Sequence, residues 1–209
     1  MVSLFANLVI SQSCLIEKNK AILNGKVVFE KPGQDAAGFL MDMYKHTATN
    51  YPKFYKMDKL CKLGFLGAEL LFSDHDVFEG YAKDEIAIVL YNANASLEAD
   101  LQYFNTVSEM ASPALFIYTL PNILIGELCI RHGIKGENIF FLQETFEVES
   151  LVDYVGLLLG QDIAKACLCG WVDLLGEEYK ACLMWVEKNK GGEIFSAAII
   201  DKLYNQNHG

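Results

Sequence analysis

The chain has 209 residues, a formal net charge of −10 and 52% hydrophobic residues. This is enough material for one sizeable core, so we expect a single domain over residues 1–209. Because Arg131 is the only arginine in an acidic chain, nucleic acid and anionic membranes are poor partners. No segment approaches the roughly 18 apolar residues needed to span a bilayer. The N-terminal segment lacks a signal-peptide pattern, so we expect a cytoplasmic protein without a membrane span.

The first third of the chain predicts two strands and a helix. Residues 4–16 predict a β-strand that leads into a polar turn, and residues 24–33 a short strand that follows an Asn-Gly turn. From Met57 apolar residues recur at helical spacing around much of the circumference, so this helix should be largely buried. The polar residues 73–76 end it.

The middle third predicts one strand and two helices. Residues 84–96 are a β-branched strand, and residues 96–109 are a helix with Ser96 as its N-cap. The segment 112–133 predicts an extended apolar start and then a helix entered through Pro121. Basic residues in the last turn and a glycine cap end this helix, namely Arg131, His132 and Gly133.

The last third predicts a strand–helix corner and then a hairpin. A strand at about 137–142 passes into an amphipathic helix that Gly160 closes. Residues 163–175 and 179–188 are two strands around a Gly-Glu-Glu turn, and 191–206 is a terminal helix or strand–helix piece. Because strands alternate with helices, the sequence predicts an α/β fold of three αβα layers around a mixed, mostly parallel sheet.

Cysteine and histidine residues give no metal or cofactor pattern. Cys167 and Cys169 face the same side of a strand, which allows a metal or redox site, but without a second pair we interpret them as core residues. His46 and His75 are alternatives as general bases, but no nucleophile lies near them in the sequence, so we interpret them as surface residues. His208 lies in the tail. We expect neither a metal nor a cofactor.

Four lysines recur every three residues in the stretch before and within the first predicted helix: Lys53, Lys56, Lys59 and Lys62. On a helix this spacing covers about half the circumference. A solvated face is one interpretation, and a docking face for an acidic partner is the other.

Three stretches in the same order resemble the β-ketoacyl-acyl-carrier-protein synthases, which have a thiolase-like fold. They are "NYPKFYKMDKLCKLGFLGAELLF", "SPALFIYTLPNILIGELCIRHGIKGEN" and "DIAKACLCGWVDLL", and together they cover roughly residues 50–175. The middle stretch carries the most specific motif residues: Ser112, Pro113, Thr119, Pro121, Asn122, Gly126, Glu127, Gly136 and Asn138. The resemblance implies the first of the two αβα halves of that fold, with substrate or structural roles for these residues.

The resemblance places the family's nucleophilic cysteine at or beside Thr145, where a strand meets a helix. This sequence has Gln143, Glu144, Thr145 and Phe146 there, with no cysteine between Cys129 and Cys167, and the family's second half with its histidines has no counterpart. A threonine nucleophile needs an adjacent base, and Glu144 would oppose an anionic thiolate or oxyanion. We therefore assign no catalytic residue at this corner.

Three hypotheses follow from this comparison. The first is a non-catalytic partner or chain-length-type subunit for fatty-acid, polyene or polyketide biosynthesis. The resemblance implies a homodimer, or a heterodimer with an active synthase, through an apolar edge strand formed by Ile139, Phe140, Phe141 and Leu142. The second is a minimal acyltransferase that uses Thr145 on acyl thioesters. The third is an acyl-carrier-protein docking module that uses the four lysines.

Overall fold

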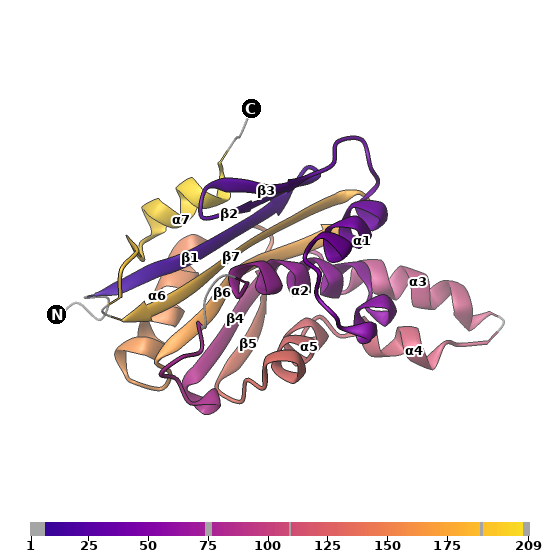
Figure 1. The fold of residues 1–209 in the computed structure, drawn as a ribbon. Coiled ribbons are helices and arrows are strands. Elements are labelled where there is room, and N and C mark those ends of the chain that lie inside the picture. The colour runs from indigo at the N-terminus through magenta and orange to yellow at the C-terminus, as the bar shows by residue number, and fades with distance from the viewer. Residues whose placement is uncertain (1–6, 74–76, 109, 189, 207–209) are drawn as a thin grey trace.

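A single eight-stranded sheet runs through the centre of the molecule (Figure 1), in a computed structural model that describes residues 7–73, 77–108, 110–188 and 190–206. The strand order is β3-β2-β1-β7-β6-β4-β5, and β8 pairs with β1. The strands are β1 (Leu8–Glu17), β2 (Lys20–Leu23), β3 (Lys26–Glu30), β4 (Ile86–Asn92), β5 (Asn138–Leu142), β6 (Ala166–Leu175), β7 (Glu178–Lys188) and β8 (Glu193–Ile194).

Helices cover both faces of this sheet and give three layers (Figure 1). The α-helices are α1 (Ala36–His46), α2 (Lys59–Leu71), α3 (Leu97–Val107), α4 (Pro113–Phe116), α5 (Ile123–His132), α6 (Val148–Gly160) and α7 (Ala197–Tyr204). Three short 3-10 helices are η1 (Pro52–Lys56), η2 (Lys83–Glu85) and η3 (Ile117–Thr119). Apolar residues of α1, α2 and α5 form the core on one face, and those of α6 and α7 form the core on the other. The predicted αβα layering is confirmed.

The sheet is mixed, as predicted, but the expectation that it is mostly parallel is wrong. Among the described strands, β4–β5 and β4–β6 pair in parallel, whereas the other five pairs are antiparallel. The reason lies in the turns: Lys18-Asn19 and Asn24-Gly25 each place two successive residues at positive φ. That backbone suits the two-residue turns of β-hairpins, so consecutive strands here fold back on each other without a helical crossover.

Two helical segments differ from the sequence expectation. Helix α1 was not predicted; Asp35 caps its N-terminus by accepting a hydrogen bond from the Gly38 backbone N–H at 2.8 Å. The segment before α5 is not extended but forms the short helices α4 and η3, because Ser112 is an N-cap and Pro113 follows it at the first helical position. The β5–α6 corner, the β6–β7 hairpin and the strand–helix piece β8–α7 are as predicted.

No single helix in the described ranges is long and apolar enough to cross a membrane. One pair of helical segments reaches the necessary length and hydropathy only when the two are taken together, and the pair is bent: Pro113–Thr119 and Ile123–His132. The apolar residues of α5 belong to the core beneath α2, where Leu124 and Leu128 are fully buried. Cys167 and Cys169 are likewise buried in β6, which fits their interpretation as core residues.

Candidate functional site

An open cleft of about 860 Å³ lies where β4, β5 and β6 end. In open α/β sheets, ligands bind at the carboxyl ends of parallel strands, so this is the position at which the fold presents a site. One part of the lining comes from the strand ends: Ala93 and Asn94 after β4, Glu144, Thr145 and Phe146 after β5, and Trp171 and Asp173 on β6. The other part comes from two hairpin turns and the last helix: Glu17, Lys18 and Asn19 at the β1–β2 turn, Glu177, Glu178, Tyr179 and Lys180 at the β6–β7 hairpin, and Asp201, Tyr204 and Asn205 on and after α7.

Aromatic side chains pack together at the β5–α6 corner. The Phe146 ring centroid lies 5.1 Å from that of Tyr204 and 5.4 Å from that of Trp171. Phe146 thereby joins the corner to α7 and β6, while Thr145 and Glu144 are exposed beside it. The sequence comparison identified the corner, but it missed Tyr204 because this residue comes from a distant helix.

Asp173 holds the loop that follows β4. Its carboxylate accepts hydrogen bonds from the backbone N–H groups of Ala93 and Asn94, at 3.2 and 2.9 Å, and from Asn94 Nδ2 at 2.7 Å. The only sequence signal for this residue was the Gly-x-x-Asp pattern at the end of the third matched stretch. Asp173 therefore sets the shape of one side of the cleft.

The charge of the cleft is strongly negative. Six carboxylates line it, from Glu17, Glu144, Asp173, Glu177, Glu178 and Asp201, against two lysines. The ammonium group of one of these lysines is already paired, because Lys180 Nζ lies 3.0 Å from Glu17 Oε2 and 4.0 Å from the ring centroid of Tyr204. This field favours cations over phosphate-bearing molecules at the mouth of the cleft.

No cysteine or histidine is found among the described residues that line the cleft. Burial raises the pKa of the Cys182 thiol to about 12 and also raises the pKa values of Cys14, Cys61, Cys129 and Cys169. A reactive cysteine needs the opposite shift, toward the thiolate. In the described ranges no group of three or more His, Cys, Asp or Glu residues could hold a metal ion.

The motif residues of the middle stretch build the scaffold and do not line the cleft. Ser112 caps α4, Thr119 Oγ1 donates to the Phe116 carbonyl at 2.7 Å, and Asn138 Nδ2 donates to the Gly136 carbonyl at 3.4 Å. Pro121 and Asn122 form the turn before α5, and Gly126 lies within that helix.

Two motif residues have specific packing roles. A side chain on Gly136 would place its Cβ 2.3 Å from the Ile86 carbonyl oxygen, so only glycine fits against the start of β4. Glu127 is buried, with 4% of its side chain exposed, and its Oε2 lies 2.8 Å from Lys53 Nζ. This ion pair joins the first matched stretch to the second.

The four lysines do not form one helical face, which corrects that expectation. Lys53 and Lys56 belong to η1, whereas Lys59 and Lys62 belong to α2, because Asp58 starts a new helix by capping it. Lys59 Nζ lies 2.6 Å from Glu98, so two of the four ammonium groups are held in ion pairs within the chain. Burial lowers the pKa of Lys62, and its amine lies 5.8 Å from the Phe54 ring centroid.

A second hollow, of about 670 Å³, lies near the end of α5. Its charged residues satisfy one another: Glu69 accepts hydrogen bonds from Arg131 Nε and Nη2 at 2.9 Å each, and from Thr49 Oγ1 at 3.0 Å. Burial lowers the pKa of His132 to about 4, so its ring is neutral at pH 7 and is not the helix-end cation that the sequence predicted. His46 is exposed and packs on the Phe29 ring, whereas His75 and His208 lie outside the described residues.

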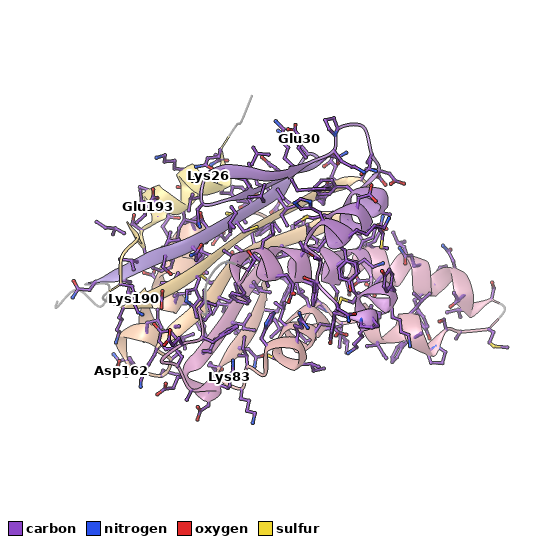
Figure 2. The ribbon with its side chains drawn as sticks, in the orientation of Figure 1. Lys26, Glu30, Lys83, Asp162, Lys190 and Glu193 are labelled. Atoms are coloured by element: carbon purple, nitrogen blue, oxygen red, sulfur yellow. The ribbon has the colours of Figure 1, made fainter. Side chains whose placement is uncertain are left out.

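The two outer strands of the sheet differ in character. The outer strand β3 carries exposed Lys26 and Glu30 (Figure 2), the kind of charged edge that discourages pairing with another chain. The outer strand β5 carries Ile139, Phe140, Phe141 and Leu142, and within the described ranges β4 is its only strand neighbour. The interface strand expected from the sequence is therefore an apolar outer strand.

No family profile and no curated protein sequence matches this chain. Solved structures do match its fold. They include the ishigamide ketosynthase/chain length factor, at 17% identity and TM-score 0.64, with 90% of this chain and 64% of that chain covered. A ketosynthase in complex with its chain length factor from Xenorhabdus doucetiae matches at 13% identity and TM-score 0.58, with 88% and 80% covered. A β-ketoacyl synthase from Burkholderia phymatum STM815 matches at 10% identity and TM-score 0.60, with 87% and 59% covered.

The chain thus has a ketosynthase/chain-length-factor-like fold. At these identities the similarity concerns the fold alone. The chain spans 59–64% of the length of the ishigamide and Burkholderia proteins.

Proposed function

We propose that this chain is a non-condensing partner subunit of a β-ketoacyl synthase, similar in role to a chain length factor, in fatty-acid or polyene/polyketide-type biosynthesis. The observation that carries the proposal is the cleft at the end of β5. Its corner presents Glu144 and Thr145, and none of its described lining residues is a cysteine or histidine. A condensing enzyme needs an activated thiolate and donors for an oxyanion at such a corner.

The charge of the cleft also supports a non-catalytic role. Thioesters of coenzyme A and of carrier proteins bring phosphate groups to the active site, and six carboxylates against two lysines disfavour them. Thr145 would need a nearby base to act as a nucleophile, and the basic residues at the cleft are Lys18 and Lys180, the second of which is paired with Glu17. A minimal acyltransferase is the less well supported alternative for these reasons.

The partner synthase would pair with β5. Hydrogen bonds from the Ile88 N–H to the Glu137 carbonyl and from the Gln143 N–H to the Asn92 carbonyl show that odd-numbered residues here bond to β4. In a strand the bonding direction alternates, so the N–H groups of Phe140 and Leu142 point away from β4. An extended strand of another chain can bond to them, and the same geometry allows a homodimer. Acyl carrier protein remains a further partner in this proposal.

Leu142 offers a sharp test of this pairing. Its side chain is exposed, so Leu142→Pro removes one outward N–H, whereas the control Leu142→Ser keeps it. The chain would be co-expressed with the condensing synthase encoded in the same gene neighbourhood, and the complex measured by size-exclusion chromatography with light scattering. We expect a complex with wild type and Leu142→Ser, and none with Leu142→Pro. A neighbourhood without a synthase, or a complex that tolerates proline, would contradict the proposal.

Mass spectrometry tests the non-condensing role separately. The chain is incubated with acyl-coenzyme A, and we expect no covalent acyl adduct on it. An adduct that forms on the wild type and disappears in Thr145→Ala would replace the partner role with the acyltransferase alternative.

A further inference from the structure

The wall of the cleft at the ends of β4, β5 and β6 combines aromatic rings with carboxylates. Its aromatic part is a cluster of Phe146, Trp171 and Tyr204, in which the ring centroids of neighbours lie 5.1 to 6.3 Å apart. The cleft volume of about 860 Å³ is within the range of about 300–1,000 Å³ that is usual for small-molecule sites. Aromatic faces attract organic cations. The cleft therefore offers ring surface next to negative charge.

The chain itself places one ammonium group on this wall. Lys180 Nζ lies 4.0 Å from the ring centroid of Tyr204 and 3.0 Å from Glu17 Oε2. An ammonium group between a ring face and a carboxylate gains a cation–π contact together with an ion pair. The wall thus already holds an alkylammonium group, by contacts that a ligand amine can also make.

Three carboxylates of the cleft are exposed and have no cation of their own. They come from different elements: Glu144 from the β5–α6 corner, Glu178 from the start of β7 and Asp201 from α7. In the described part of the chain no lysine, arginine or histidine forms an ion pair with them. The other carboxylates of the cleft are engaged within the chain: Glu17 by Lys180, Asp173 by the loop after β4, and Glu177 by the Ala36 N–H.

A single metal ion does not match these three carboxylates. A hard cation such as Ca²⁺ needs about six to eight oxygen atoms that converge on one point. Among the residues that the structure describes, no group of three or more His, Cys, Asp or Glu could hold such an ion. Because the unpaired carboxylates lie on separate elements around an open cleft, they suit a ligand whose positive charges are spaced apart.

We propose that the cleft binds a linear aliphatic polyamine. Its ammonium groups pair with Glu144, Glu178 and Asp201, and the methylene chain between them lies along the Phe146 ring. The field supports this ligand, because six carboxylates face two lysines in the cleft and the whole chain has a net charge of −10. The residues that bind the polyamine all belong to this chain, so the site does not depend on the proposed partner role.

Isothermal titration calorimetry of the purified chain with spermidine tests the proposal. At about 20 mM salt we expect a Kd of roughly 10–100 µM, and about 200 mM salt should weaken it at least about 5-fold because exposed charges are screened. Glu144→Gln/Asp201→Asn removes two unpaired carboxylates at nearly constant size and should weaken binding about 5- to 10-fold. The matched control is Asp84→Asn/Glu137→Gln, which removes two exposed carboxylates near the opposite ends of β4 and β5 and should leave binding unchanged.

Two further measurements distinguish a built site from diffuse attraction of counterions. Phe146→Leu keeps an apolar side chain but removes the ring, and it should weaken spermidine binding about 2- to 5-fold, as expected for an exposed cation–π contact. Far-UV circular dichroism confirms that this variant is folded. Butylamine has one ammonium group and Mg²⁺ has no methylene chain, so each should bind at least about 10-fold more weakly than spermidine.

Other outcomes overturn the polyamine site. Spermidine that does not bind at concentrations up to about 1 mM has no site in this cleft. If Mg²⁺ bound as tightly as spermidine, or if the control variant lost as much affinity as Glu144→Gln/Asp201→Asn, net charge alone would explain the binding. A lysine-rich peptide that binds where spermidine does not would make the cleft a peptide-docking surface. Each titration uses the chain alone, so such a result leaves the pairing through β5 to its own test with Leu142→Pro.

Discussion

The ion pair between Lys53 and Glu127 gives the most quantitative test of how this fold is held together. The Glu127 side chain is 4% exposed and the Lys53 side chain 42%, with 2.8 Å between Nζ and Oε2. Lys53→Met keeps the aliphatic length of the side chain but leaves a buried carboxylate without its cation. The variant therefore isolates the cost of an unpaired buried charge.

The magnitude follows from the burial of the two partners. Breaking a fully buried pair costs about 3–5 kcal/mol, whereas an exposed pair contributes about 0–1 kcal/mol. Because Glu127 is buried and Lys53 is half exposed, we expect Lys53→Met to lower the free energy of unfolding by about 2 kcal/mol. For a chain of this size that corresponds to a fall in Tm of about 4–8 °C.

The double variant Lys53→Met/Glu127→Gln supplies the control. It removes both charges, so it should recover more than half of the loss, because a neutral amide is cheaper to bury than a lone carboxylate. Urea unfolding followed by tryptophan fluorescence measures all variants, since Trp185 is fully buried. If Lys53→Met changed the free energy of unfolding by less than about 0.5 kcal/mol, or if the double variant were no more stable than the single one, the reasoning would be refuted.

Three further predictions concern single residues. Gly136→Ala should lower the free energy of unfolding by about 1–3 kcal/mol, because the new Cβ would meet a backbone oxygen. The control Gly126→Ala, with no atom within 4 Å of the new Cβ, should be neutral or stabilising by up to about 1 kcal/mol. Equal Tm values for the two variants would contradict this prediction. Burial lowers the pKa of His132 to about 4, below the value of about 6.5 in the unfolded chain. Between these two pH values the unfolded state binds more protons than the folded state. The free energy of unfolding should therefore fall by about 2 kcal/mol from pH 7 to pH 4.5. Urea denaturation at several pH values measures this change. In His132→Gln the free energy of unfolding should depend less on pH than in the wild type, and an equal pH dependence would contradict the prediction. Asp173→Ala removes three hydrogen bonds and should destabilise the chain by about 2 kcal/mol in urea, with Asp201→Ala as a neutral control.

Local features of the sequence predicted much of the secondary structure. The strand β4, the corner between β5 and α6 and the β6–β7 hairpin were all identified, because each depends on neighbouring residues: an apolar run, a helical stripe or a turn at Gly176. The resemblance to the synthases also led to a fold that the solved structures match. Local pattern failed where capping decided the outcome, as in α1, which begins at the Asp35 cap, and in α4, which begins after Ser112.

Tertiary structure decided what the sequence could not, because the deciding contacts join distant segments. The sequence revealed the Asn24-Gly25 turn, but it did not reveal the Lys18-Asn19 turn or the antiparallel pairing of β1 with β7, which joins distant parts of the chain and makes the sheet mixed. The cleft places the corner at Thr145 beside α7 and the β1–β2 turn. The four lysines are divided between η1 and α2, because Asp58 caps the start of α2. In α3 the packing buries Ala99 and leaves Leu97, Leu101 and Phe104 exposed. Periodicity predicts that a helix has an apolar side, but only packing determines which way that side faces.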